Sequence, residues 1–177
     1  MTIMNLQNNK KMKTTTIILD HHQINQKIKR IAYQIYEANS SEKEVVIAGI
    51  QGNGIYFAEQ LAKSLQQISS LKIILCEVYI DKKNPLDTIS TSIQNIEYKN
   101  KPIVLVDDVL NSGTTLMYGI KYFLDVPLKQ FKTAVLVNRN HKKYPVKADF
   151  KGISLSTSIK EHVEVVFDGE KSKAFLM

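Results

Sequence analysis

The stretch IVLVDDVLNSGTTL occupies residues 103–116 and joins an apolar run to two adjacent carboxylates, Asp107 and Asp108. A loop of small and hydroxylated residues, NSGTT at 111–115, follows the acids, and an apolar pattern then resumes. A short apolar run bounded by a glycine-containing loop is typical of a buried strand in a parallel sheet. The stretch therefore predicts a strand, a tight loop and a helix, with two acids where the strand ends.

The composition is that of a globular protein of one domain. The chain has 177 residues, 44% of them apolar, and a formal net charge of +7. No apolar run reaches the ~18 residues that a membrane-spanning helix needs, so we expect no membrane partner. The single cysteine, Cys76, cannot form an internal disulfide, which agrees with a cytoplasmic location. Residues 1–13 have no periodicity and are expected to form a flexible extension outside a domain at 14–177.

Strand and helix patterns alternate along the rest of the chain. Helices are expected at 23–39, 55–68 and 116–124, and strands at 14–20, 45–50, 72–80, 102–108, 131–140, 153–158 and 162–168. Residues 81–100 are polar and are expected to form a mobile loop with a weak strand near 90–96. Such alternation predicts the α/β class: a single domain with a parallel sheet and helices on both faces.

Ligands of parallel α/β sheets bind where the strands end at their carboxyl sides. That rule brings three segments to one edge of the predicted sheet: 51–54, 107–115 and the residues after Val137. Two acids at this edge can hold the vicinal hydroxyls of a sugar or orient a hydrated Mg²⁺. The loop 111–115, at the start of a helix, can bind an anion through backbone N–H groups and hydroxyls. Together they describe a site for ribose 5-phosphate. The alternative is that Asp107, Asp108 and Ser112 only cap the helix, although a cap needs one such residue.

The segment VLVDDVLNSGTTL resembles the 5-phosphoribosyl-1-diphosphate (PRPP) motif of the type I phosphoribosyltransferases. Within that superfamily the chain is similar to the PyrR branch, the pyrimidine-operon regulators with uracil phosphoribosyltransferase activity. The similarity runs from about residue 16 to residue 167. It rests on IILD, KRIAYQIYEAN, GIYFAEQLA, VDDVLNSGTT and TAVLVNRNHKKYPVKADFKGISLSTS.

The resemblance implies a single-domain fold with a small hood and a mobile flap, and a reaction in which uracil and PRPP give UMP and pyrophosphate. Asp107 and Asp108 would be the catalytic acids that hold the ribose hydroxyls, with Mg²⁺ as cofactor bound indirectly. The implied site residues are Asn111, Ser112, Gly113, Thr114 and Thr115 for the 5-phosphate; Gln51, Gly52, Asn53 and Gly54 for the pyrophosphate; Tyr79, Lys82 and Lys83 in the flap; and Arg139, His141, Asp149, Phe150, Lys151 and Gly152 in the hood over the base.

Several positions depart from the family pattern. The pyrophosphate loop usually carries Lys and Arg, as in KTRG, but here it is the uncharged QGNG. The flap reads VYIDKKNP in place of a TLYRDD-like segment, so Lys82 and Lys83 are the candidates to replace the missing cations. VNRNH at 137–141 replaces VDRGH. Asn111 stands where purine-using relatives carry an Asp that can take a proton, which argues against hypoxanthine or guanine.

A function of another class is a non-catalytic or weakly catalytic regulator that senses a nucleotide such as UMP and binds RNA. The candidate RNA surface is Lys29, Arg30, Lys142, Lys143 and Lys147. Cations interleaved with Tyr and Phe suit phosphate contact and base stacking, but a solvated basic surface is an equal interpretation. A homologue with neither activity is the third possibility. The uncharged QGNG loop is the feature that separates a transferase from a sensor, because a transferase needs cations beside the leaving group and a sensor does not. The resemblance also implies a homodimer or a larger homo-oligomer.

Overall fold

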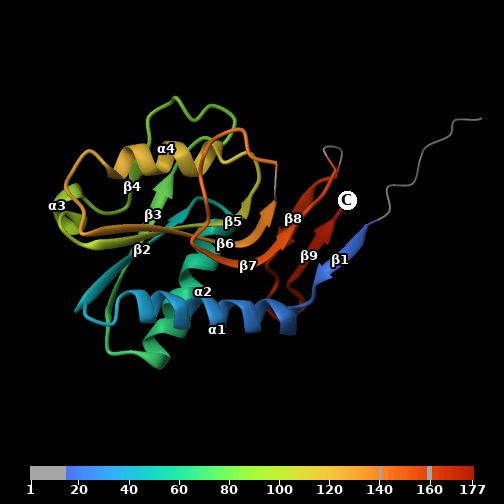
Figure 1. Ribbon diagram of the computed structural model, residues 1–177, viewed down its shortest axis with the longest axis horizontal. Helices are drawn as coiled ribbons and strands as arrows, with labels where there is room; N and C mark the ends of the chain where they lie inside the picture. The colour runs from blue at the N-terminus through green and yellow to red at the C-terminus, as the bar shows by residue number, and fades with distance from the viewer. Residues whose placement is uncertain (1–14, 140, 159–160) are drawn as a thin grey trace, which may run out of the picture.

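The computed structural model describes residues 15–139, 141–158 and 161–177. A central sheet lies between two layers of helices, and a smaller sheet lies beyond the carboxyl-end edge of the central one (Figure 1). The expected extension at 1–13 lies outside the described residues. In the part of the chain that is described, no helix combines the length and the apolar character needed to cross a membrane.

The central sheet has six strands in the order β4-β3-β2-β5-β6-β7. Its parallel members are β2 (Glu44–Ile50), β3 (Lys72–Tyr79), β5 (Pro102–Leu110), β6 (Gln130–Arg139) and β7 (Phe150–Leu155). The short β4 (Ser90–Thr91) pairs antiparallel with β3. From β2 the chain adds β3 on one side and β5 on the other. The direction of winding therefore reverses between β2 and β5, and this is where such sheets bind ligands.

The strands β2 and β5 are buried on both faces, which explains their continuous apolar sequences. Their alternate side chains enter two separate cores. Val45 and Ile47 pack in the layer of α1 (His21–Ala38) and α2 (Asn53–Ile68). Val46 and Ala48 pack in the opposite layer with α4 (Thr114–Phe123) and the one-turn helix α3 (Asn95–Tyr98). The predicted α/β class with helices on both faces is confirmed.

Helix α1 begins at a capping box. The backbone N–H of Gln23 donates to Asp20 Oδ1 at 2.8 Å, and the backbone N–H of Asp20 donates to Gln23 Oε1 at 3.0 Å. Each bond satisfies an N–H that the first helical turn would leave unpaired. The helix then buries one apolar stripe against the sheet, formed by Ile24, Ile28, Ile31, Ala32 and Ile35.

The smaller sheet contains β1 (Thr16–Leu19), β9 (Lys173–Leu176) and β8 (Val163–Val166), all antiparallel, in the order β1-β9-β8. The 3₁₀ turn η1 (Gly169–Lys171) joins β8 to β9. The strands expected at 14–20 and 162–168 are present as β1 and β8, outside the parallel sheet, and β9 was not predicted. The physical reason is visible in β8, where Val163 and Val165 are buried and Glu164 and Val166 are exposed, because this alternation suits a half-exposed antiparallel strand.

Two other segments differ from expectation. In place of a weak strand over 90–96, the chain forms the two-residue β4 and then α3. The strand expected at 153–158 is β7, which begins at Phe150 and ends at Leu155. Gly152 lies inside this strand because β6 passes very close: a Cβ at this position would lie 2.4 Å from the carbonyl oxygen of Leu136. Gly152, which the resemblance placed in the hood, therefore marks a close approach of two backbones.

Replacing Gly152 by Ala should destabilise the fold by about 1–3 kcal/mol, because backbone rather than a movable side chain blocks the added methyl group. Urea unfolding followed by circular dichroism measures the free energy of unfolding. Gly169→Ala is the matched control: its φ is +46°, but a Cβ there would meet no described atom within 4 Å, so only about 1 kcal/mol of backbone strain is expected. Equal costs for the two variants would contradict the close packing of β7 on β6.

Candidate functional site

The two acids lie at the carboxyl end of β5, at the reversal point of the sheet. Asp107 is 4% exposed, and Asp108 is half-buried. Oδ1 of Asp107 accepts the backbone N–H of Asp108 and the ammonium of Lys82, both at 3.0 Å. Asp108 accepts the backbone N–H of Val109 on Oδ1 and the amide of Asn53 on Oδ2, both at 2.9 Å. The side chains around the pair thus come from β5, from the start of α2 and from the segment after β3.

Burial raises the pKa of Asp107 to about 7, because the charged form is deprived of water. The attraction of Lys82 opposes this shift, and the negative charge of Asp108 adds to it. Burial is the largest single influence on Lys82 and lowers its pKa, but the charge of Asp107, the hydrogen bond to it and the charge of Asp108 together outweigh burial, so the pKa of Lys82 is raised overall. Near neutral pH the site therefore combines a carboxyl that can exchange its proton with an ammonium that keeps its own.

The loop 111–115 forms the start of α4 beside the acids. Gly113 is the N-cap residue with φ +81° and ψ 0°, and a Cβ there would lie 2.4 Å from Cγ1 of Val146. The hydroxyls of Ser112 and Thr114 are 2.9 Å apart. A hollow of about 40 Å³ is enclosed by this loop and Asp107. The helix-cap interpretation is wrong for the two acids, since the cap is a glycine and the carboxylates bond elsewhere.

The loop 51–54 lies on the other side of the acids, at the start of α2. Gly52 has φ +85° and ψ −133°, a conformation available to glycine. Gly54 lets α2 approach β5, because a Cβ there would lie 3.0 Å from the carbonyl oxygen of Val106 and 3.2 Å from Asp107 Oδ1. A cavity of about 670 Å³ is lined by Gln51, Gly52, Asn53, Asp81, Lys82, Lys83 and Asp108. The acid pair thus separates a small hydroxyl-lined hollow from a larger one whose lining includes two lysines.

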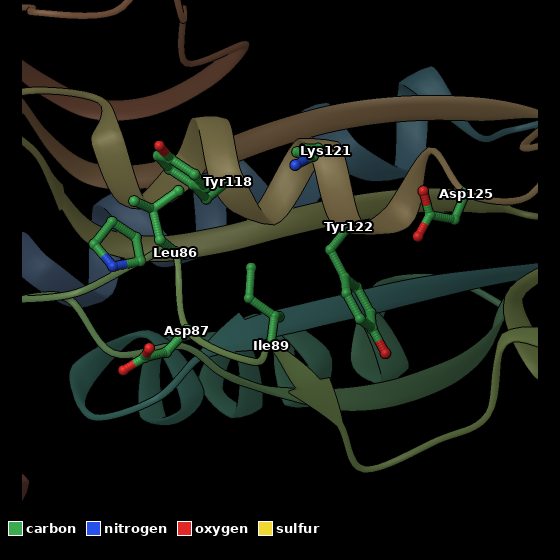
Figure 2. A pocket seen from close by; sticks show the side chains of 8 residues that line it. Leu86, Asp87, Ile89, Tyr118, Lys121, Tyr122 and Asp125 are labelled. Atoms are coloured by element: carbon green, nitrogen blue, oxygen red, sulfur yellow. The ribbon is translucent and has the colours of Figure 1, made fainter.

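The predicted flap is divided between two places. Lys82 reaches the acids, whereas the Tyr79 hydroxyl donates to Glu77 on the exposed side of β3. Further along, the flap runs beside α4, where Leu86, Asp87 and Ile89 face Tyr118, Lys121, Tyr122 and Asp125 across a cavity of about 210 Å³ (Figure 2). The hydroxyls of Thr91 and Tyr122 are 3.2 Å apart. The end of the flap is therefore fastened to α4.

Arg139 and His141, predicted to cover a base, both bond to the segment that follows β7. Arg139 is 3% exposed and donates to Asn111 Oδ1 and Thr157 Oγ1, both at 3.0 Å. It also donates to the carbonyls of Ser158 and Glu161, at 3.3 and 2.7 Å. A ring nitrogen of His141 bonds to the carbonyl of Thr157. The guanidinium therefore joins the loop 111–115, the predicted phosphate loop, to the segment that follows β7, and its donors are occupied by groups of the protein itself.

The prediction that Asp149, Phe150, Lys151 and Gly152 form the hood is wrong. Asp149 accepts the backbone N–H of Thr133 at 3.0 Å, and Phe150 pairs with Ala134 in the middle of β6. These residues open β7, and the carboxyl ends of the strands lie at the opposite end of it. The segment at the correct end includes Thr157, Ser158 and Glu161. The carboxyl-end rule could have found it if the bounds of β7 had been predicted correctly.

The candidate RNA residues fall into two separate groups. On α1, Lys29 is exposed, while Arg30 donates to the carbonyls of Lys151 and Gly152 in β7, at 2.8 and 2.6 Å. Lys142, Lys143 and Lys147 are exposed on a segment whose Val146 packs in the opposite layer. This second group is close to the phosphate loop: the backbone N–H groups of Lys143 and Tyr144 donate to the carbonyl of Ser112, at 2.8 and 3.1 Å.

Replacing Asp107 by Asn should stabilise the fold at pH 8. Because the folded pKa lies above the ordinary value, the folded state keeps a proton between about pH 4 and pH 7 that the unfolded state has lost. Wild-type stability therefore falls as pH rises through this window and levels off above it. The variant should melt roughly 2–6 °C higher at pH 8, with a smaller difference at pH 4.5. Thermal unfolding at both pH values measures this, with Asp125→Asn, an exposed acid, as control. A difference that does not grow with pH would contradict the burial cost.

A scan of protein families matches the chain over residues 14–168 to the family described as the phosphoribosyl transferase domain. Among curated proteins, the Bifunctional protein PyrR of Limosilactobacillus reuteri is 32% identical over 167 residues, covering 87% of this chain and 94% of the relative. The Bifunctional protein PyrR of Bacillus cereus AH820 is 31% identical over 164 residues, covering 87% and 91%.

Solved structures agree on the fold. The hypoxanthine phosphoribosyltransferase of Trypanosoma cruzi superposes with a TM-score of 0.72 at 15% identity, over 84% of each chain. A hypoxanthine-guanine phosphoribosyltransferase of Bacillus anthracis gives 0.67 at 18% identity, over 79% of this chain and 82% of that one. At this identity the likeness concerns the fold alone. The chain has a type I phosphoribosyltransferase fold and belongs to the phosphoribosyl transferase domain family, in its PyrR branch.

Proposed function

We propose that this protein binds PRPP with Mg²⁺ and transfers the phosphoribosyl group to uracil. The observation that carries the proposal is the buried acid pair between two hollows. PRPP has the same order of groups: a 5-phosphate, a ribose with vicinal hydroxyls, and a pyrophosphate. The loop 111–115 suits the 5-phosphate, the acids suit the hydroxyls, and the cavity beside 51–54 suits the pyrophosphate.

In this reaction the bond from C1′ to the pyrophosphate oxygen breaks, N1 of uracil forms the new bond to C1′, and the proton of N1 passes to the departing pyrophosphate. Asp107 and Asp108 would orient the ribose through its hydroxyls and favour the positive charge that develops at C1′. The start of α4 would fix the 5-phosphate through backbone N–H groups. Lys82 and Lys83 line the cavity in which the negative charge of the pyrophosphate grows.

The acid pair fits Mg²⁺ held mainly by the substrate. Among the residues that the structure describes, no three His, Cys, Asp or Glu side chains gather closely enough to hold a metal by themselves. Mg²⁺ usually keeps several waters and binds through one or two carboxylates together with substrate phosphates. Bound with PRPP, it would neutralise charge on the leaving pyrophosphate.

The choice of uracil is supported by Asn111. Its amide oxygen accepts a hydrogen bond from Arg139, and an amide cannot take a proton from a purine nitrogen. The PyrR relatives are similar to this chain over most of their length, and their name describes them as bifunctional. A transferase that also acts as a regulator is consistent with that name.

Calorimetric titration with PRPP and Mg²⁺ tests the proposal. Wild type should bind, and Asp107→Asn should bind at least roughly tenfold more weakly, since hydrogen bonds from the ribose hydroxyls to a charged acceptor are lost. This loss would not reflect unfolding, because the same variant is expected to be more stable at pH 8. Turnover is then measured with uracil, hypoxanthine and guanine, and uracil should be used preferentially.

Two further variants sharpen the assay. Asp125→Asn removes an exposed acid two residues beyond the end of α4 and should bind PRPP like wild type. Gln51→Lys returns a cation to the uncharged loop and should strengthen PRPP binding about fivefold. Absence of PRPP binding by wild type would exclude the transferase, and turnover of a purine instead of uracil would exclude the proposed base.

Nucleotide-dependent binding of RNA is the second candidate function. It is favoured by the hydrogen bonds that join the basic segment 142–147 to the carbonyl of Ser112 in the phosphate loop. A nucleotide phosphate bound in that loop would hold the segment and its three lysines in one position. RNA contact and ligand binding would then be coupled through two backbone hydrogen bonds.

The triple variant Lys142→Gln, Lys143→Gln, Lys147→Gln should weaken binding of single-stranded RNA in the presence of UMP. Fluorescence anisotropy over a range of salt concentrations should show a slope reduced by about 2, since each phosphate contact on a single strand contributes roughly 0.7. The matched control replaces Lys63, Lys99 and Lys171, which are also exposed. Equal slopes for both triple variants would show a diffuse effect of net charge and no RNA surface.

A further inference from the structure

The ammonium of Lys82 lies where a ligand of the acid pair would have to bind. Its Nζ is 3.0 Å from Asp107 Oδ1 and 4.0 Å from Asp108 Oδ1. The acid side chains are 5% and 13% exposed, whereas that of Lys82 is 42% exposed. The lysine thus covers the acids from the solvent side and is itself easily rehydrated.

The acids are held from a second direction by Asn53. Its amide donates to Asp108 Oδ2 at 2.9 Å and to the carbonyl of Val165 in β8 at 2.8 Å. This contact is neutral and fixed between two elements, so it leaves the charge of the pair unbalanced. The positive charge at the pair is supplied by Lys82.

The attachment of Lys82 keeps it beside the loop 51–54 whatever its side chain does. Ile80, two residues earlier, is 1% exposed and packs in the core under α4. The backbone N–H of Gln51 donates to the carbonyl of Val78 at 2.8 Å, which joins that loop to the end of β3. The four-carbon stem of a lysine can therefore turn from the acids toward the cavity while the backbone stays in place.

We propose that Lys82 exchanges between two partners: it neutralises Asp107 and Asp108 in the ligand-free protein and moves onto the pyrophosphate when PRPP and Mg²⁺ take the acids. This exchange rests on the proposed function. It accounts for the uncharged QGNG loop, because Lys82, which rests on the acid pair, would supply the cation that this loop lacks. It also means that a divalent cation has to compete with Lys82 for the empty site.

Binding of Mn²⁺ to the ligand-free protein, followed by electron paramagnetic resonance, tests the resting state. Lys82→Met should bind Mn²⁺ at least roughly tenfold more tightly than wild type, because one unit charge beside the carboxylates is removed. The same variant should bind PRPP with Mg²⁺ about tenfold more weakly, because the pyrophosphate loses a cation. Lys63→Met, which removes an exposed cation from α2, should change neither affinity by more than about twofold.

Opposite changes in the two affinities are the signature of exchange. Unchanged Mn²⁺ affinity in Lys82→Met would overturn the resting contact, and tighter Mn²⁺ binding with unchanged PRPP affinity would overturn the transfer. If wild type does not bind PRPP, the proposed function and the transfer both fail, whereas the Mn²⁺ comparison still decides whether Lys82 guards the acids. Melting temperatures of all variants verify that they are folded.

Discussion

A carboxylate buried at the end of an apolar strand is the constraint on which the site depends. Asp107 is removed from water by β5 and its neighbours, and an ion in such a place is tolerated when donors surround it. The donors come from the backbone of Asp108 and from Lys82. Gly54 allows α2 to close over the acid. Lys82 in the flap and Gly54 at the start of α2 are therefore both positioned around one carboxyl group, which needs hydrogen-bond donors and close packing.

A second buried charge organises the opposite edge of the site. The guanidinium of Arg139 contacts Asn111 on the phosphate loop and three groups in the segment after β7. Arginine suits this task because its planar group presents several donors at fixed angles. The phosphate loop is therefore held by Arg139 at its first residue and by the segment 143–144 at its second. Its shape does not depend on its own sequence alone.

The local sequence pattern predicted the strands that are buried on both faces and the helices whose buried residues recur at a regular spacing. The strands β2 and β5 are apolar throughout because both faces are covered, and α1 repeats its isoleucines at helical spacing. The acids and both glycine loops were predicted from the same signals. The start of β7 was missed because Gly152 looks like a loop residue, and its reason for being there, the carbonyl of Leu136, lies on another strand. The hydrogen bonds that occupy the guanidinium of Arg139, and the contact of Lys82 with Asp107, join residues that are far apart in the sequence. A local sequence pattern therefore could not predict them.

Because of the small sheet, the acid pair can be completed only after segments late in the sequence have been synthesised. Strand β1, near the start of the chain, pairs with β9, near its end, and β8 on the other side of β9 receives the amide of Asn53 that also holds Asp108. Closing a loop of nearly the whole chain is slow and entropically costly. On the ribosome, β1 has an unpaired edge until β9 emerges. The acid pair can therefore acquire its final set of hydrogen bonds only once the small sheet has formed, so a chain stalled before β9 would carry the complete PRPP motif without the sheet that holds it in place.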